Sequence, residues 1–237
     1  MQPTPGQIVA FGGGGFAMEP DNPLLDDYVL GLCGSARPRV CLVPTASGDS
    51  PAWIERFYEC FPDDRCEPTH LSLFSRGVDD LAEFLAGQDV VYVGGGNTVN
   101  LLAVWRAQGL APLLPALLAR GTIFCGVSAG ALCWFGRGIT DSYGPALSPL
   151  ENGLGILPGS FCPHYDSDPR RPFAFADYVR STGESGLAAE DGVGLHYVGG
   201  RLHRVVSSRP AASAWRLDPA EDGVRVERLA PEYLGGE

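Results

Sequence analysis

Apolar residues in this chain of 237 residues gather in short runs that end at glycine or at other small residues. The clearest runs cover residues 7–11, 39–43, 90–93 and 122–125, and a less regular one covers residues 68–73. Short runs without polar alternation are typical of strands that are buried on both faces, as in a parallel sheet. The pattern therefore predicts five buried parallel strands.

Segments with apolar residues at helical spacing separate these strands. They cover residues 23–32, 53–61, 78–85, 99–108 and 112–120. Strands that alternate with helices predict an α/β fold with a doubly wound, mostly parallel sheet, whose functional loops meet at the carboxyl ends of the strands. Neither a flexible linker nor a block of charge divides the chain, so we expect a single domain over residues 1–237.

The chain after residue 135 is less regular. Residues 136–160 are rich in glycine, proline and serine, and we expect loops around a functional site there. Residues 193–198 and 201–206 are apolar and are separated by two glycines, which predicts a late β-hairpin.

The sequence Gly126-Val127-Ser128-Ala129-Gly130 joins the last predicted parallel strand to an expected helix. A serine between two glycines at a strand-to-helix turn has the form of a nucleophile elbow, in which a tight and strained backbone exposes the hydroxyl. The following helix would direct its N–H groups and the positive end of its dipole toward an oxyanion beside Ser128. A serine hydroxyl also needs a base to take its proton.

Four histidines could supply that base, namely His70, His164, His196 and His203. His164 lies in a proline-bounded loop after a short apolar run, where a rigid backbone can present an imidazole, so we predict it as the base. The other three lie within or beside predicted strands, and we expect them to be packed or surface side chains.

A carboxylate would fix the tautomer of the imidazole and stabilise the imidazolium. The acidic candidates are Asp141, Asp166, Asp168, Glu190 and Asp191. Asp191 precedes a predicted strand, where a turn could direct it to the carboxyl edge of the sheet, although Asp before Gly is also an ordinary turn pair. The residues alone leave this choice open.

Two glycine runs follow predicted strands. The run at residues 12–15 lacks the third glycine of a dinucleotide fingerprint, no acid ends the second strand, and the chain contains no lysine for a phosphate-binding loop. Residues 94–98, Gly-Gly-Gly-Asn-Thr, end the strand beside the elbow strand. Their bare N–H groups could form half of an oxyanion hole with Ala129 supplying the rest, and Asn97 or Thr98 could instead simply cap the next helix.

Charge and composition indicate which classes of binding partner and cofactor to expect. The formal net charge is −11 and basic residues do not cluster beyond Arg170-Arg171, so nucleic acid and an anionic membrane are not expected partners. We expect a cytoplasmic protein, because the sequence shows neither a secretory signal nor a long apolar span. The seven cysteines and four histidines show no metal-type spacing, so we expect no metal and mostly reduced, buried thiols.

Taken together, several motifs resemble one family. They are V-Y-V-G-G-G-N-T at 91–98, G-V-S-A-G-A at 126–131, T-D-S at 140–142, P-H-Y-D at 163–166 and A-E-D-G at 189–192. In this order they resemble the peptidase E family, the serine aspartyl dipeptidases related to cyanophycinases. The likeness implies a flavodoxin-like fold, similar to class I glutamine amidotransferases.

The resemblance also implies roles for individual residues. It makes Ser128 the nucleophile, His164 the base and Asp191 the orienting acid, with Gly95 or Gly96 and Ala129 as the oxyanion hole. Small peptides are the implied substrates, with Asp-X dipeptides as the family's preference, and no cofactor is implied; a homodimer is compatible with the sequence. The remaining candidate substrate contacts are Asn97, Asp141, Arg170 and Arg171.

The sequence departs from the family at one important position. The best-known aspartyl dipeptidases have Glu where Asp191 stands, so the backbone here must lie closer to His164. A relative that binds small peptides or metabolites without turnover is one alternative. Another is an amidase-like hydrolase that uses a cysteine near the elbow, namely Cys125, Cys133 or Cys162.

Overall fold

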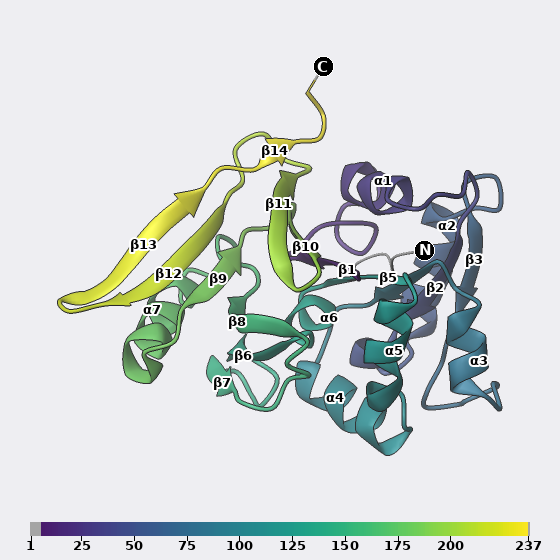
Figure 1. The fold of residues 1–237 in the computed structure, drawn as a ribbon, viewed down its shortest axis with the longest axis horizontal. Coiled ribbons are helices and arrows are strands. Elements are labelled where there is room, and N and C mark those ends of the chain that lie inside the picture. The colour runs from purple at the N-terminus through teal and green to yellow at the C-terminus, as the bar shows by residue number, and fades with distance from the viewer. Residues whose placement is uncertain (1–5, 237) are drawn as a thin grey trace.

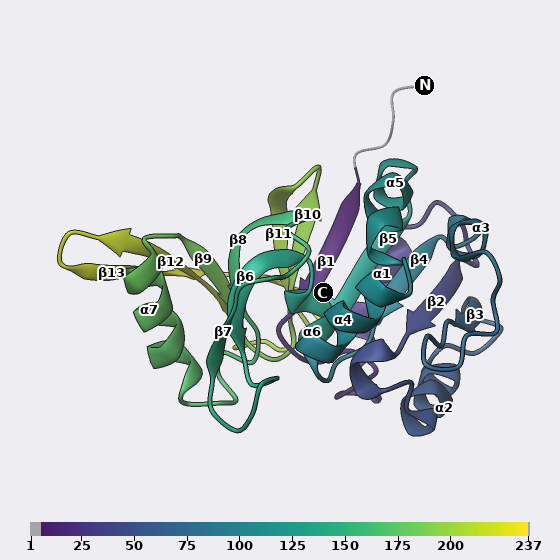
Figure 2. The same ribbon diagram turned by 90° about the horizontal axis from the view of Figure 1, so that it is seen from below.

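A computed structural model describes residues 6–236 of the chain, so the first five residues and the last one of the predicted domain lie outside the described residues. The strands fall into two sheets (Figures 1 and 2). The strands of the larger sheet are β1 (Gln7–Phe11), β2 (Arg39–Val43), β3 (Glu67–His70), β4 (Val90–Val93), β5 (Ile123–Val127), β10 (Val193–Val198), β11 (Arg201–Ser207) and β14 (Glu232–Tyr233). Their order is β14-β11-β10-β1-β5-β4-β2-β3.

The five strands predicted from the apolar runs form the parallel part of this sheet, β1-β5-β4-β2-β3. Beside β1, strand β10 runs antiparallel, and it pairs with β11 as the predicted late hairpin. The predicted α/β fold with a mostly parallel sheet is confirmed.

Helices cover both faces of the parallel strands. Nearly every residue of β1, β2, β4 and β5 is buried, whereas the edge strand β3 is more open. The helices are α1 (Leu24–Gly31), α2 (Pro51–Cys60), α3 (Leu81–Ala86), α4 (Thr98–Ala107), α5 (Leu114–Ala119), the single turn α6 (Ala129–Leu132) and α7 (Arg171–Thr182), with 3₁₀ turns at Thr45–Ser47 and Ala111–Leu113. Successive residues of β1 point to opposite faces, so Val9 belongs to the apolar core that includes residues of α1 and α2, whereas Ile8 belongs to the core that includes residues of α3 to α6. This is the doubly wound arrangement that the pattern predicts.

The second sheet corrects the expectation of loops over residues 136–160. Its strands are β6 (Phe135–Thr140), β7 (Ser148–Leu150), β8 (Leu157–Cys162), β9 (Gly186–Ala189), β12 (Ala214–Ala220) and β13 (Gly223–Leu229), in the order β13-β12-β9-β8-β6-β7. Glycines within β6 and β8 allow close packing between strands, so glycine content was misleading there. Helix α7 packs on this sheet, and the β12–β13 hairpin projects away from the larger sheet (Figures 1 and 2).

No single helix between residues 6 and 236 is long and apolar enough to cross a membrane, although the bent pair Thr98–Ala107 and Ala111–Ala119 passes on length and composition alone.

Candidate active site

Ser128 lies at the carboxyl edge of the larger sheet, between the end of β5 and the start of α6. Its backbone has φ 55° and ψ −111°, a strained conformation for a residue that carries a β-carbon. The side chain is half-buried. However, α6 has only four residues, so its dipole is too small to stabilise an oxyanion as expected from the sequence. Stabilisation of an oxyanion there must come from individual N–H groups.

The glycines on either side of Ser128 are required by close packing. A β-carbon on Gly126 would lie 2.3 Å from the carbonyl oxygen of Gly130, and one on Gly130 would lie 2.3 Å from the carbonyl oxygen of Val93. The two ends of the turn therefore pack against each other, and the second end also packs against β4. Neither position has room for a methyl group.

Replacing Gly130 by alanine is expected to push α6 away from β4 and to destabilise the protein by about 1–3 kcal/mol, the usual cost of overpacking. For a chain of this size, that corresponds to a fall in Tm of several degrees. Thermal unfolding measures it. Gly31→Ala is the matched control, because a β-carbon there meets nothing within 4 Å; an equal Tm for the two variants would contradict the packing argument.

His164 is joined to Asp191 by a hydrogen bond of 2.6 Å between Nδ1 and Oδ1. Asp191 is almost completely buried, and His164 is more open to solvent. Burial alone would raise the pKa of Asp191, but the hydrogen bonds from His164 and Ser167 and the charge of His164 outweigh it, so the pKa lies below its usual value. An ionised carboxylate only accepts, so the proton of this hydrogen bond is on Nδ1, and in the neutral imidazole Nε2 is then able to accept. The shorter side chain of Asp191 therefore reaches His164.

The end of β1 connects the three predicted triad residues. The amide of Ser128 donates to the carbonyl oxygen of Phe11 at 3.1 Å, and the amide of His164 donates to that of Gly12 at 3.2 Å. Gly13 then forms an isolated parallel bridge with Asp191. Consecutive residues of one strand end thus hold segments that are far apart in the sequence.

The other acidic candidates have different partners. Asp166 accepts a hydrogen bond of 2.8 Å from the backbone amide of Asp191, so it helps to hold the backbone of that residue in place. Asp168 pairs with Arg170, and Glu190 accepts from the indole of Trp215. Of the five candidates, Asp191 is the one that is hydrogen-bonded to the imidazole of His164.

The glycine loop after β4 lies beside Ser128, because β4 and β5 pair in parallel. A β-carbon on Gly95 would lie 3.6 Å from Cβ of Ser128. Asn97 caps α4 by accepting from the amide of Asn100 at 2.8 Å, and its amide group donates to the carbonyl oxygen of Ser142. The structure thus gives Asn97 the capping role and attaches the loop after β6 to the glycine loop.

The two candidate arginines already have carboxylate partners. Arg170 is exposed and makes paired hydrogen bonds to Asp168. Arg171 is buried, at 4% exposure, and its guanidinium lies 3.6 Å from Asp141 and 4.0 Å from Asp168. Asp141 itself is exposed and pairs with Arg171, so these residues form a charged cluster next to the loop of His164.

The cysteines near Ser128 are poor candidates for a nucleophile. Burial raises the pKa of the Cys162 thiol to about 12, and it raises the pKa of Cys125 and Cys133 well above the usual value. A thiol must lose its proton to react readily, so these positions favour inert packing.

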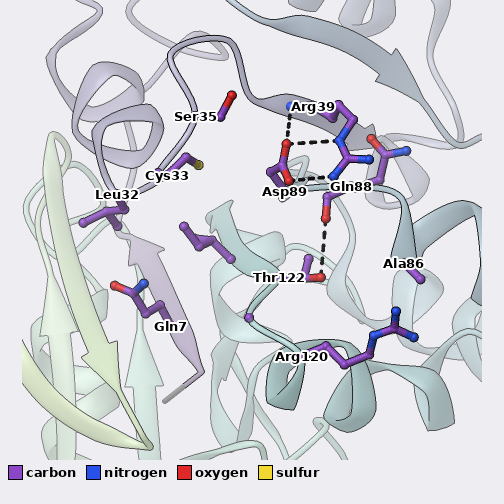
Figure 3. A pocket seen from close by; sticks show the side chains of 13 residues that line it. Gln7, Leu32, Cys33, Ser35, Arg39, Ala86, Gln88, Asp89, Arg120 and Thr122 are labelled. Atoms are coloured by element: carbon purple, nitrogen blue, oxygen red, sulfur yellow. Dashed lines mark hydrogen bonds and ion pairs between the residues drawn. The ribbon is translucent and has the colours of Figure 1, made fainter. Parts of the chain in front are cut away.

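A cavity of about 400 Å³ opens at the opposite edge of the larger sheet, among the amino ends of its strands (Figure 3). Its wall includes the paired Arg39 and Asp89, together with Gln7, Cys33 and Arg120. It is therefore separate from the surroundings of Ser128. Within residues 6–236, no group of three or more His, Cys, Asp or Glu side chains could hold a metal ion.

The contacts of Gly12 and Gly13 with this site are not among the sequence-based predictions, where Asp166 appears only as a candidate for the orienting acid. The position of the glycine run at 12–15 directly after the first strand is the signal that could have indicated its role. Asp166 lies two residues after His164, but its contact with the amide of Asp191 depends on how β8 and β9 pair.

Comparisons with known proteins identify the family of the chain. The model of peptidase family S51 matches residues 8–205. The uncharacterized peptidase YgaJ of Bacillus subtilis (strain 168) is 48% identical over 230 residues, 97% of this chain and 99% of that protein. Peptidase E of Streptomyces coelicolor is 31% identical over 145 residues, 60% of this chain and 58% of that protein.

Among solved structures, a peptidase from an acI-B1 Actinobacterium has the same fold, with a TM-score of 0.73 at 18% identity, covering 98% of this chain and 96% of that one. The family match extends over most of the sequence, and one relative aligns along nearly its full length. The chain therefore belongs to peptidase family S51, in agreement with its resemblance to peptidase E, and it is a serine-type peptidase.

Proposed function

We propose that this peptidase hydrolyses small peptides through a triad of Ser128, His164 and Asp191 and an acyl-enzyme intermediate. The observation that carries the proposal is the hydrogen bond of 2.6 Å between His164 and Asp191, formed where the end of β1 also binds the amide of Ser128. A carboxylate on Nδ1 leaves Nε2 as the proton acceptor that a serine nucleophile requires.

In the proposed reaction, Nε2 of His164 takes the proton of Ser128 as Oγ attacks the peptide carbonyl carbon. The imidazolium then gives that proton to the leaving amine, and water attacks the resulting ester with His164 again as base. Within residues 6–236 the Ser128 hydroxyl and the His164 ring form no hydrogen bond, so the ring must approach Oγ when substrate binds. Such contacts commonly tighten in the complex with substrate.

The oxyanion would be stabilised by backbone amides on two sides. In the described part of the chain, the amides of Gly95 and Gly96 have no hydrogen-bond acceptor, whereas those of Gly94 and Asn97 bind carbonyl oxygens. Gly95 is half-buried and lies beside Ser128, Gly96 is exposed and follows it in the same loop, and the amide of Ala129 directly follows Ser128 in the chain. Free N–H groups beside a nucleophile are the arrangement that this role needs.

A fluorophosphonate probe tests the proposal. We expect covalent labelling of the wild-type protein and no labelling of Ser128→Ala, with strongly reduced labelling of His164→Ala, because the probe reacts with an activated serine. Iodoacetamide should leave activity largely intact, since the nearby thiols are buried. A folded wild type that neither reacts with the probe nor cleaves peptides would instead support binding without turnover.

A preference for Asp-X dipeptides is a finer proposal, and it needs a cation for the aspartate side chain. Arg171 is the buried candidate, and Nε of its guanidinium has no hydrogen-bond acceptor within the described chain. Hydrolysis of Asp-Leu and of the isosteric, neutral Asn-Leu should be compared. Faster cleavage of Asp-Leu that Arg171→Met abolishes would support the preference, and equal rates for the two dipeptides would remove it.

A further inference from the structure

Asp26 is a buried carboxyl group that the proposed reaction does not use. It lies on α1 with 2% of its surface exposed. Burial raises its pKa to about 7, although the charge of Arg65 and the hydrogen bonds from Tyr92 and the amide of Phe16 act in the opposite direction. Burying a carboxyl group costs free energy unless its hydrogen bonds are satisfied, so its position needs a physical explanation.

The hydrogen bonds of Asp26 converge on one end of the glycine run at residues 12–15. The hydroxyl of Tyr92, which is fully buried on β4, donates to Oδ1 of Asp26 at 3.1 Å. A β-carbon on Gly15 would lie 2.5 Å from the Tyr92 hydroxyl and 3.1 Å from Oδ1 of Asp26. Gly15 also has φ +62°, which favours glycine. The Asp26–Tyr92 pair therefore packs directly against Gly15 and leaves no room there for a side chain.

The aromatic ring of Phe16 closes the same end. It is buried, and its centroid lies 5.0 Å from that of Tyr92 in an edge-on contact. The backbone of Phe16 also lies close enough to Asp26 to lower the pKa of this carboxyl. This fixes where the chain emerges from the glycine run.

The other end of the run is pressed against the proposed acid and base. A β-carbon on Gly13 would lie 2.0 Å from Oδ1 of Asp191 and 3.0 Å from Cε1 of His164. The carbonyl oxygen of Gly13 accepts from the amide of Gly192 at 3.0 Å, and that of Gly12 accepts from the amide of His164. The run therefore occupies the space between the buried pair and the hydrogen bond that orients His164.

We propose that Asp26 is a positioning residue, which with Tyr92 fixes the glycine run at 12–15 so that the run holds Asp191 against His164. The catalytic consequence rests on the proposed function, but the effect on the His164–Asp191 hydrogen bond does not. The glycine run at 12–15, which lacks the features of a phosphate loop, would then serve to position Asp191.

The experiment compares Asp26→Leu with Asp27→Leu, its matched control on the same helix. Asp27 is an exposed neighbour whose side chain pairs with Arg65. Asp26→Leu leaves the Tyr92 hydroxyl without its acceptor. We expect kcat for peptide hydrolysis to fall about tenfold with KM changed less than about twofold, because a misplacement of about 1 Å can cost roughly 100-fold and a shift of the run by part of that distance costs less. The conservative Asp26→Asn should recover most of kcat, and Asp27→Leu should retain it.

Two readouts separate positioning from general loss of stability. The proton on Nδ1 of His164, assigned by its absence in His164→Ala, should give a strongly downfield NMR signal in wild type and Asp27→Leu, and this signal should shift upfield or disappear in Asp26→Leu. In an Asp191→Asn background, Asp26→Leu should lower kcat by less than about twofold, because both changes act on one interaction.

An unchanged NMR signal together with an unchanged kcat in folded Asp26→Leu would overturn the inference, even if Tm falls. If Asp26→Leu does not fold, Tyr92→Phe is measured in its place, and an unaltered signal and kcat in that variant overturn the inference equally. If the wild type cleaves no peptide, the proposed function fails, and the NMR signal alone still decides whether Asp26 acts on His164.

Discussion

Replacing Ser128 by alanine is expected to lower kcat/KM for peptide hydrolysis by at least about 10⁴-fold, because the acyl-enzyme then has no oxygen on which to form. The residual rate should come from binding and from the backbone amides near Gly95. Steady-state kinetics with a panel of dipeptides and short peptides measures the loss, with Tm showing that the variant remains folded.

Ser142→Ala is a suitable comparison for that variant, because it removes a hydroxyl from the same edge of the sheet. Ser142 accepts a hydrogen bond from the amide of Thr98 and supports the start of α4. We expect a much smaller decrease, within about tenfold. If Ser128→Ala retained more than about a tenth of the wild-type rate, Ser128 would not be the nucleophile.

Replacing Asp191 by asparagine is expected to lower kcat by about 1,000-fold or more. Asparagine removes the charge that stabilises the imidazolium, and its amide can hold the wrong tautomer of His164. Because the pKa of Asp191 lies below its usual value, the wild-type carboxylate is ionised at neutral pH. The acid limb of the pH profile should therefore not arise from Asp191 itself.

Asp141→Asn is the matched control, and it decides between two acids that the sequence presents as candidates. Asp141 is 58% exposed and its partner is Arg171, so its loss should lower kcat less than about tenfold. Measurement of kcat and KM for both variants distinguishes the two. A larger effect at Asp141 than at Asp191 would assign the orienting role to Asp141.

Much of the larger sheet could be predicted because β1, β2, β4 and β5 are buried on both faces and the helices beside them have one apolar side. The helix predicted at 99–108 is observed at Thr98–Ala107, and the strand predicted at 90–93 is observed with the same limits. The second sheet could not be predicted this way. Strand β8, for example, contains proline, glycine and serine, and it forms because it lies between β6 and β9.

The candidate site shows the same division. The glycines around Ser128 and the proline before His164 are local signals, since each restricts the backbone where it stands. The choice among five acidic residues had no local signal, because Asp191 meets His164 across 27 positions of sequence. That meeting depends on the end of β1, which binds the segments of Ser128, His164 and Asp191 in turn.

From the amino acids alone came the α/β pattern, the strained serine turn, the histidine and the family, because each is encoded in neighbouring residues or in an ordered series of short motifs. The hydrogen bond of Asp191 to His164, which the residues alone left open and the family resemblance implied, depends on the tertiary structure. So do the partners of Arg170 and Arg171 and the position of Asp26 next to the glycine run. These depend on distances between residues far apart in the chain, and such distances are set by strand pairing and packing rather than by any local preference.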